Sequence, residues 1–150
     1  MKIKTSSWKK GLGKLGVLTP LLGSWQANAE SPMGKVRCTR TFTQILNGKY
    51  VHLVARWEFG AKVYEEFAIF GINNGKLSFW SFTSDGKKSE GVIADGVDVH
   101  PQAIAFEAEM PAGRARMMYW PNEDGSINWA VEAKNKKGWK RFTQHKYVSL

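Results

Sequence analysis

The sequence predicts an all-β protein: a closed up-and-down antiparallel barrel of about ten strands, preceded by a short N-terminal helix. Short alternating runs of apolar and polar residues fill the chain from Gly23 onward, and no helical period survives there. Pairs such as Asn-Gly and Asp-Gly, which favour hairpin turns, separate the runs. The length of 150 residues, with 43% hydrophobic and 13% aromatic residues, suits one domain with its own core.

The first 20 residues are predicted to form a helical or extended segment before a barrel of residues 21–150. Ser6 or Ser7 would cap a short amphipathic helix. Three apolar residues of this helix share one face: Trp8, Leu12 and Leu15. Thr19-Pro20 is expected to start a helical turn, because proline suits the first helical position.

Residues 1–29 also have the outline of a secretory signal, with a basic start and small residues at Ala27-Asn28-Ala29. Lys14 and Pro20 interrupt its apolar stretch. Cleavage after residue 29 would also remove Gly23-Ser24-Trp25, which we expect to be structural. The sequence therefore favours a cytoplasmic protein.

Ten candidate strands follow in order. The first begins at Gly23, and the others span residues 35–46, 50–59, 64–72, 77–82, 91–94, 104–110, 114–120, 127–133 and 139–148. Because the connections are short, neighbouring strands are expected to pair in an antiparallel meander. Closing the sheet removes its two exposed edges and places the first strand beside the last. A two-sheet sandwich is the main alternative, but it usually needs longer crossings.

Alternation along each strand assigns its side chains to two faces. On strand 139–148, one set is Trp139, Arg141, Thr143, His145 and Tyr147. Such sets mix aromatic and charged residues, which indicates a barrel cavity with polar groups. The alternative is that these sets face water. The expected ligand-binding residues are Trp25, Tyr50, His52, Arg56, Glu66, Trp80, Arg116, Trp129, His145 and Tyr147.

One ion pair is expected within this cavity. Glu66 shares a face with Tyr64 and Phe70, and Arg56 lies on the preceding strand. An Arg56–Glu66 pair would be either a polar anchor for a ligand or only a structural contact.

Positive charge is concentrated at the two ends of the chain. The net charge is +9; residues 1–40 carry eight Lys/Arg and one acid, and residues 134–150 carry six and none. Closing the barrel would bring these ends into one basic flank for anionic partners. The lysines concerned are Lys2, Lys4, Lys9, Lys10, Lys14, Lys134, Lys136, Lys137 and Lys140. Nucleic-acid or anionic-membrane binding is therefore an alternative function, beside a basic surface that only aids solubility.

The sequence contains few features that would support an enzyme function. Cys38 is the single cysteine, which excludes an intramolecular disulfide. Neither a local zinc-ligand spacing nor a nucleophile elbow occurs. Residues 11–16 match Gly-x-Gly-x-x-Gly, but no strand precedes them. We expect a binding protein rather than an enzyme, with no metal and no cofactor apart from the haem considered below.

Two stretches resemble a known family. Leu21-Leu22-Gly23-Ser24-Trp25 is similar to the Gly-x-Trp opening of lipocalins and other calycins. A second set resembles the uncharacterised bacterial lipocalin-like barrels: residues 47–51, 71–73, Gly75, 79–83, Gly86 and Glu90-Gly91. The resemblance covers about residues 21–147. It implies a barrel whose floor is closed by Trp25, under a basic residue of the last strand, here Arg141 or Lys140, and it implies no enzyme activity.

Weaker similarity links the chain to fatty-acid-binding proteins and nitrobindins. The first group reads a carboxylate with Arg-x-Tyr on the last strand, where this chain has His145-Lys146-Tyr147. Three arginines would instead be available for such a carboxylate: Arg56, Arg116 and Arg141. Nitrobindins bind haem through a C-terminal histidine, which would correspond to His145. The expected function is therefore a carrier or sensor that holds a small, partly apolar, anionic ligand in the cavity.

Overall fold

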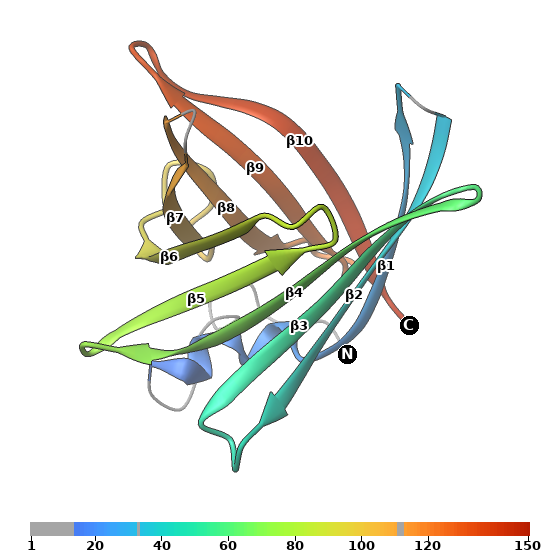
Figure 1. Ribbon diagram of the computed structural model, residues 1–150. Helices are drawn as coiled ribbons and strands as arrows, with labels where there is room; N and C mark the ends of the chain where they lie inside the picture. The colour runs from blue at the N-terminus through green and yellow to red at the C-terminus, as the bar shows by residue number, and fades with distance from the viewer. Residues whose placement is uncertain (1–13, 33, 111–112) are drawn as a thin grey trace.

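The computed structural model describes residues 14–32, 34–110 and 113–150. It forms one closed barrel in which each strand pairs antiparallel with the next and β10 returns to β1 (Figure 1). The strands are β1 (Gly23–Ser31), β2 (Gly34–Ile45), β3 (Tyr50–Phe59), β4 (Lys62–Asn73), β5 (Lys76–Thr83), β6 (Lys88–Ala94), β7 (Ile104–Met110), β8 (Gly113–Pro121), β9 (Ile127–Asn135) and β10 (Gly138–Ser149). The predicted ten-strand up-and-down barrel is confirmed.

Turn residues with left-handed backbone explain why the hairpins form where the sequence places them. Asn47 and Gly48 have φ angles of 59° and 75° between β2 and β3, and Asn74 and Gly75 have 51° and 75° between β4 and β5. Asparagine and glycine tolerate this conformation, and its twist matches that of the flanking strands. These turns therefore fix which strands become neighbours.

A short 3₁₀ helix closes one end of the barrel. η2 (Leu15–Leu21) places Leu18 and Leu21 in the core, and the Trp25 indole N–H donates to the Leu21 carbonyl at 2.8 Å. Pro20 lies near the end of this helix, so the expectation that it starts a helical turn is wrong. We call this end, with the β2–β3 and β4–β5 turns, the closed end.

The opposite end, which we call the open end, carries five hairpin turns. They join β1–β2, β3–β4, β5–β6, β7–β8 and β9–β10; the β1–β2 and β9–β10 turns are at the top of Figure 1. Lys134, Lys136 and Lys137 lie here, whereas the Lys14 ammonium bonds to the Gly75 carbonyl at the closed end. Lys14 therefore lies at the other end of the barrel from Lys134, Lys136 and Lys137. Several expected N-terminal residues lie outside the described residues: Lys2, Lys4, Ser6, Ser7, Trp8, Lys9, Lys10 and Leu12.

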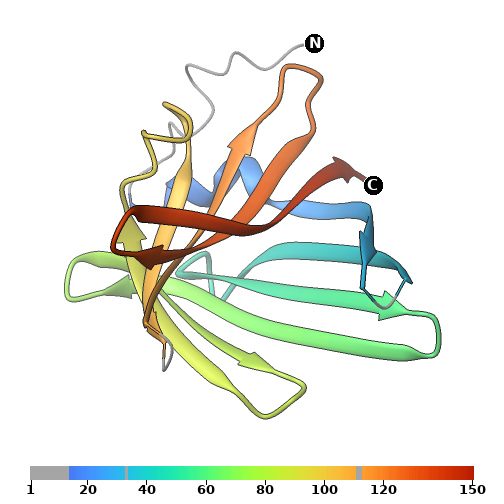
Figure 2. The ribbon, with the colours of Figure 1, turned by 90° about the horizontal axis from the view of Figure 1, so that it is seen from above.

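Two pairs of neighbouring strands are joined by few residues. β1 and β10 share the register pairs Trp25–Ser149 and Gln26–Val148, beside a bond from the Leu150 N–H to the Ser24 carbonyl (Figures 1 and 2). β6 and β7 are paired only where residues 92–94 face residues 105–107. The barrel wall is therefore least continuous at these two places.

Side chains pack on both sides of the wall. Inside, the buried residues of all strands but β6 and of η2 form one cluster. Outside, the segment 95–103 covers a second, smaller cluster that contains Ala103, Ala105, Met118, Trp120 and Ala130. Within the described residues, no helix combines the length and apolar character needed to cross a bilayer.

Candidate functional site

The expected ligand-binding residues divide between the two faces of the wall. Five belong to the inward sets of their strands: Trp25, Glu66, Trp129, His145 and Tyr147. The other five alternate with buried inward residues and so face outward: Tyr50, His52, Arg56, Trp80 and Arg116. Half of the residues expected inside the barrel therefore point inward, and the other half point outward.

The expected Arg56–Glu66 pair is wrong. Arg56 faces outward and approaches Glu65 at 3.7 Å, with both side chains about half exposed. Glu66 points inward, and its carboxylate lies 3.8 Å from Nη2 of Arg40. Arg40, on β2, is therefore the cation that Glu66 meets inside the barrel.

Arg116 has a structural role on the outer face. It donates to both oxygens of Asp98 at 2.9 and 2.7 Å and to Glu132 at 2.8 Å, and its guanidinium lies 4.5 Å from the Trp139 ring centre. The hydrogen bonds from Arg116 lower the pKa of Asp98. Arg116 thus ties segment 95–103 to β8 through Asp98, and β8 to β9 and β10 through Glu132 and Trp139.

A β-bulge explains why the last strand does not present one face throughout. The register between β9 and β10 shifts between Arg141 and Thr143, so Phe142 is the additional residue. Trp139 and Arg141 consequently face outward. After the bulge, the inward-facing residues are Thr143, His145 and Tyr147. Arg141 donates to Glu132 at 2.9 Å and lies over Trp120. It does not lie above Trp25, contrary to the expectation.

Arg40 is the centre of the interior, and sequence reasoning missed it. Its side chain is fully buried, and Nε and Nη2 donate to the Tyr119 hydroxyl at 3.1 and 2.8 Å. Four aromatic rings surround its guanidinium at 4.8–5.9 Å: Trp57, Tyr119, Trp129 and Tyr147. The available signal was alternation on β2, where Arg40 shares the inward set of Cys38 and Phe42.

The surroundings of Arg40 keep its buried guanidinium charged. Burial alone lowers the Arg40 pKa, but the surrounding hydroxyls and the Glu66 carboxylate raise it overall, so the guanidinium stays charged. Burial raises the pKa of Tyr119 to about 12 and that of Cys38 to about 11, against the opposing effect of Arg40. Burial and the Arg40 charge together lower the pKa of His145. The hydroxyl, thiol and imidazole are therefore neutral at pH 7.

Four polar atoms in this interior form no hydrogen bond of normal geometry among the described residues, although each is buried. We call them the polar cluster: Arg40 Nη1, Trp129 Nε1, His145 Nδ1 and the Tyr147 hydroxyl. Their side chains are contiguous, with ring centres of Trp129, His145 and Tyr147 between 5.2 and 6.4 Å apart. Buried polar groups are rarely left unpaired, because each costs about 1–3 kcal/mol. Their clustering marks a candidate binding site.

Two cavities lead from the open end toward the polar cluster. The outer one, about 680 Å³, is lined by residues of β1–β4, β9 and β10, including Phe142 and His145. The inner one, about 220 Å³, contains Glu66 and several aromatic side chains. Trp57, Tyr64 and Trp129 line both cavities, so their rings separate the two spaces. The rings of Trp57 and Trp129 also lie over Arg40.

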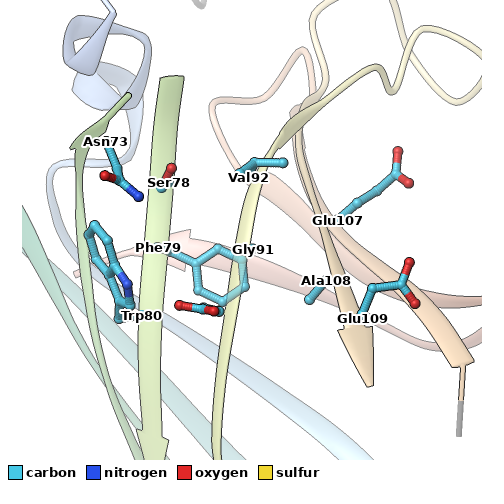
Figure 3. Close-up of a pocket in the computed structure, with 10 residues that line it drawn as sticks. Asn73, Ser78, Phe79, Trp80, Gly91, Val92, Glu107, Ala108 and Glu109 are labelled. Carbon is cyan, nitrogen blue, oxygen red and sulfur yellow. The ribbon is translucent and has the colours of Figure 1, made fainter. Parts of the chain in front are cut away.

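A third hollow, of about 390 Å³, lies between β5, β6 and β7 (Figure 3). The Phe79 ring lies beside Gly91 there, and Phe79 also lines the inner cavity. A Cβ at Gly91 would clash with the Glu107 carbonyl oxygen and would lie 2.6 Å from the Phe79 ring. The ring therefore fills the wall where β6 and β7 are poorly paired.

The histidines differ in their surroundings. His145 lines the outer cavity, His52 packs against Phe67 on the outer face, and His100 accepts a bond from the Gln102 N–H at 3.0 Å. Of the three histidines, His145 is thus the one that lines the outer cavity. Among residues 14–32, 34–110 and 113–150, no three His, Cys, Asp or Glu side chains gather as a metal site would require.

Comparison with known proteins does not assign the chain to a family. No family model and no curated protein matches the chain. One similar solved structure is described as a "De novo design of a fluorescence-activating beta barrel", with 13% identity and a TM-score of 0.42, covering 86% of this chain and 93% of that chain. The lipocalin-like resemblance stays a prediction, and the chemistry of the site has to be inferred from its own geometry.

Proposed function

We propose that the protein is a carrier or sensor that binds a small, partly apolar, anionic molecule inside the barrel, next to Arg40. The observation that carries this is the polar cluster, in which four contiguous buried atoms form no hydrogen bond of normal geometry. The nitrogens of Arg40 and Trp129 can only donate hydrogen bonds. The Tyr147 hydroxyl and the His145 imidazole can act as donors as well. The complementary ligand therefore presents acceptor oxygens to the cluster and an apolar body to the surrounding rings.

The charge distribution favours an anion over a cation. The Glu66 carboxylate lies 3.8 Å from Nη2, beyond hydrogen-bond distance, and leaves Nη1 unpartnered. A carboxylate or similar group would use the free nitrogen of the guanidinium. Since the Trp57 and Trp129 rings cover Arg40, with centroids 6.4 Å apart, the ligand has to displace them on entry.

Three probes of one shape test this function: naphthalene-2-carboxylate, its carboxamide and 2-(aminomethyl)naphthalene. We expect the carboxylate to bind at least about tenfold more tightly than the amide, and the ammonium to bind most weakly, in calorimetric titrations at pH 7. Tighter binding of the ammonium would overturn the proposal, because Glu66 rather than Arg40 would then select the ligand. Absence of binding by all three would contradict small-molecule binding by this cavity.

A matched pair of tyrosine variants locates the site. Tyr147→Phe removes a hydroxyl that forms no hydrogen bond of normal geometry, so we expect carboxylate affinity to fall about tenfold, with a smaller change in the free energy of unfolding than in Tyr119→Phe. Tyr119→Phe removes the acceptor of two Arg40 bonds and should destabilise the fold by about 1–3 kcal/mol. Unchanged affinity in Tyr147→Phe would exclude the polar cluster as the site.

A further inference from the structure

Charge on the described residues is strongly polarised along the barrel. The five open-end turns, with the three strand residues on either side of each, carry nine Lys/Arg and five acids. Four of these cations belong to the β9–β10 hairpin: Lys134, Lys136, Lys137 and Lys140. The other five are spread over the remaining hairpins: Lys35, Lys62, Lys87, Lys88 and Arg114. The acids are Glu30, Glu58, Asp85, Glu90 and Glu109.

The closed end lacks such an excess. Its described turns, connections and strand ends carry Lys14, Lys49 and Lys76 against four acids, namely Asp95, Asp98, Glu123 and Asp124. Lys146 on β10 also reaches this end, where it pairs with Asp124 at 3.0 Å. The basic surface is therefore a property of the end at which the cavity opens, and not of the barrel as a whole.

Exposed apolar side chains lie among these cations. Phe142 is 64% exposed at the β10 bulge, and Val63 on β4 is 43% exposed; both line the outer cavity. Met110 and Pro32 are exposed at neighbouring hairpins of the same end. An apolar rim ringed by lysines fits the boundary of an anionic bilayer, where charge attracts the protein and apolar groups insert between headgroups.

We propose that the open end docks on anionic lipid bilayers, with the cavity mouth facing the membrane. Lysines supply long-range attraction, and Phe142 and Val63 contact the acyl boundary. The exposed apolar groups favour a bilayer over nucleic acid, since a phosphate backbone would need only the cations. Docking in this orientation would let an amphipathic ligand move between membrane and cavity without crossing water.

Vesicle co-sedimentation of the full chain tests the proposal, with phosphatidylcholine vesicles compared with vesicles containing 30% phosphatidylglycerol. We expect binding to the anionic vesicles only, weakening as salt is raised. The double variant Lys136→Glu/Lys137→Glu should bind at least tenfold more weakly, whereas its control Lys49→Glu/Lys76→Glu, with the same change of charge at the closed end, should bind like the wild type.

A second matched pair tests the apolar contact. Phe142→Ser should weaken binding about fivefold, and Leu46→Ser should leave it unchanged, although Leu46 is 68% exposed at the closed end. All variants retain residues 1–13, so differences between them cannot come from that segment. Equal loss in both lysine variants, or retained binding in both, would overturn the proposal. So would binding of a single-stranded oligonucleotide without vesicle binding, which would assign the open end to nucleic acid.

Discussion

At the scale of single residues, Arg40 organises the interior. A fully buried guanidinium is expensive unless it is paired, and here one hydroxyl, one distant carboxylate and four rings share that task. Ring faces attract cations, so Trp57 and Trp129 both shield and stabilise the charge. The same charge acts on every titratable neighbour, including Cys38 and His145.

His145 links this charge to the pH dependence of stability. Its pKa is lowered in the folded state, so the unfolded chain takes up a proton first as pH falls below about 6.5. The stabilising contribution is therefore complete above that pH and is lost on acidification. We expect the urea midpoint of the wild type to fall more between pH 7.5 and 5.5 than that of His145→Gln. Parallel decreases in both proteins would contradict the assignment.

At the scale of elements, two glycines on either side of β5, Gly71 on β4 and Gly91 on β6, show how the wall packs. A Cβ at Gly91 would clash with the backbone carbonyl of Glu107, whereas a Cβ at Gly71 would meet only the side chain of Tyr50, at 2.5 Å. A carbonyl in the wall cannot move without shifting β7. The half-buried Tyr50 ring on the outer face can turn away.

Alanine at these two positions should therefore have unequal effects. We expect Gly91→Ala to lower the free energy of unfolding by about 1–3 kcal/mol, as overpacking does, and Gly71→Ala by less than about 1 kcal/mol. Urea unfolding of both variants at pH 7 measures the difference. Equal losses of unfolding free energy in the two variants would mean that the β7 backbone moves aside as easily as the Tyr50 side chain.

Strand order and pairing could be predicted from the sequence, because each turn carries local chemistry such as Asn47-Gly48 that acts within a few residues. It was harder to predict which side chains point into the barrel and which point outward. Alternation assigns two sets but does not say which is inside when both contain aromatics, as on β3. The bulge at Phe142 changes the parity of the last strand and has no local sequence signal. Arg40 was missed because a fully buried arginine is rare.

At the scale of the whole molecule, the barrel depends on a short closure. Every other neighbouring pair but β6–β7 shares five or more register positions, whereas β1 and β10 share two. If this closure fails, two strand edges become exposed and available for pairing with other chains.

Deleting residues 148–150 should therefore open the barrel. It removes the paired residues Val148 and Ser149 and the bond from the Leu150 N–H to the Ser24 carbonyl. We expect a loss of about 2–4 kcal/mol from a few backbone hydrogen bonds, with oligomers in size-exclusion chromatography. The control Val148→Thr/Ser149→Thr keeps the backbone and should stay close to wild type. A monomeric, fully stable deletion would show that the closure is dispensable.

The closure also decides how the protein would respond to mechanical force. Gly23 at the start of β1 and Ser149 at the end of β10 lie at the same end of two adjacent antiparallel strands. Tension applied between them loads the hydrogen bonds one after another, as in opening a zipper, rather than all together in shear. An unfolding machine that pulls on either strand would therefore meet its weakest resistance first, and β10 would peel from the barrel before the polar cluster is disturbed.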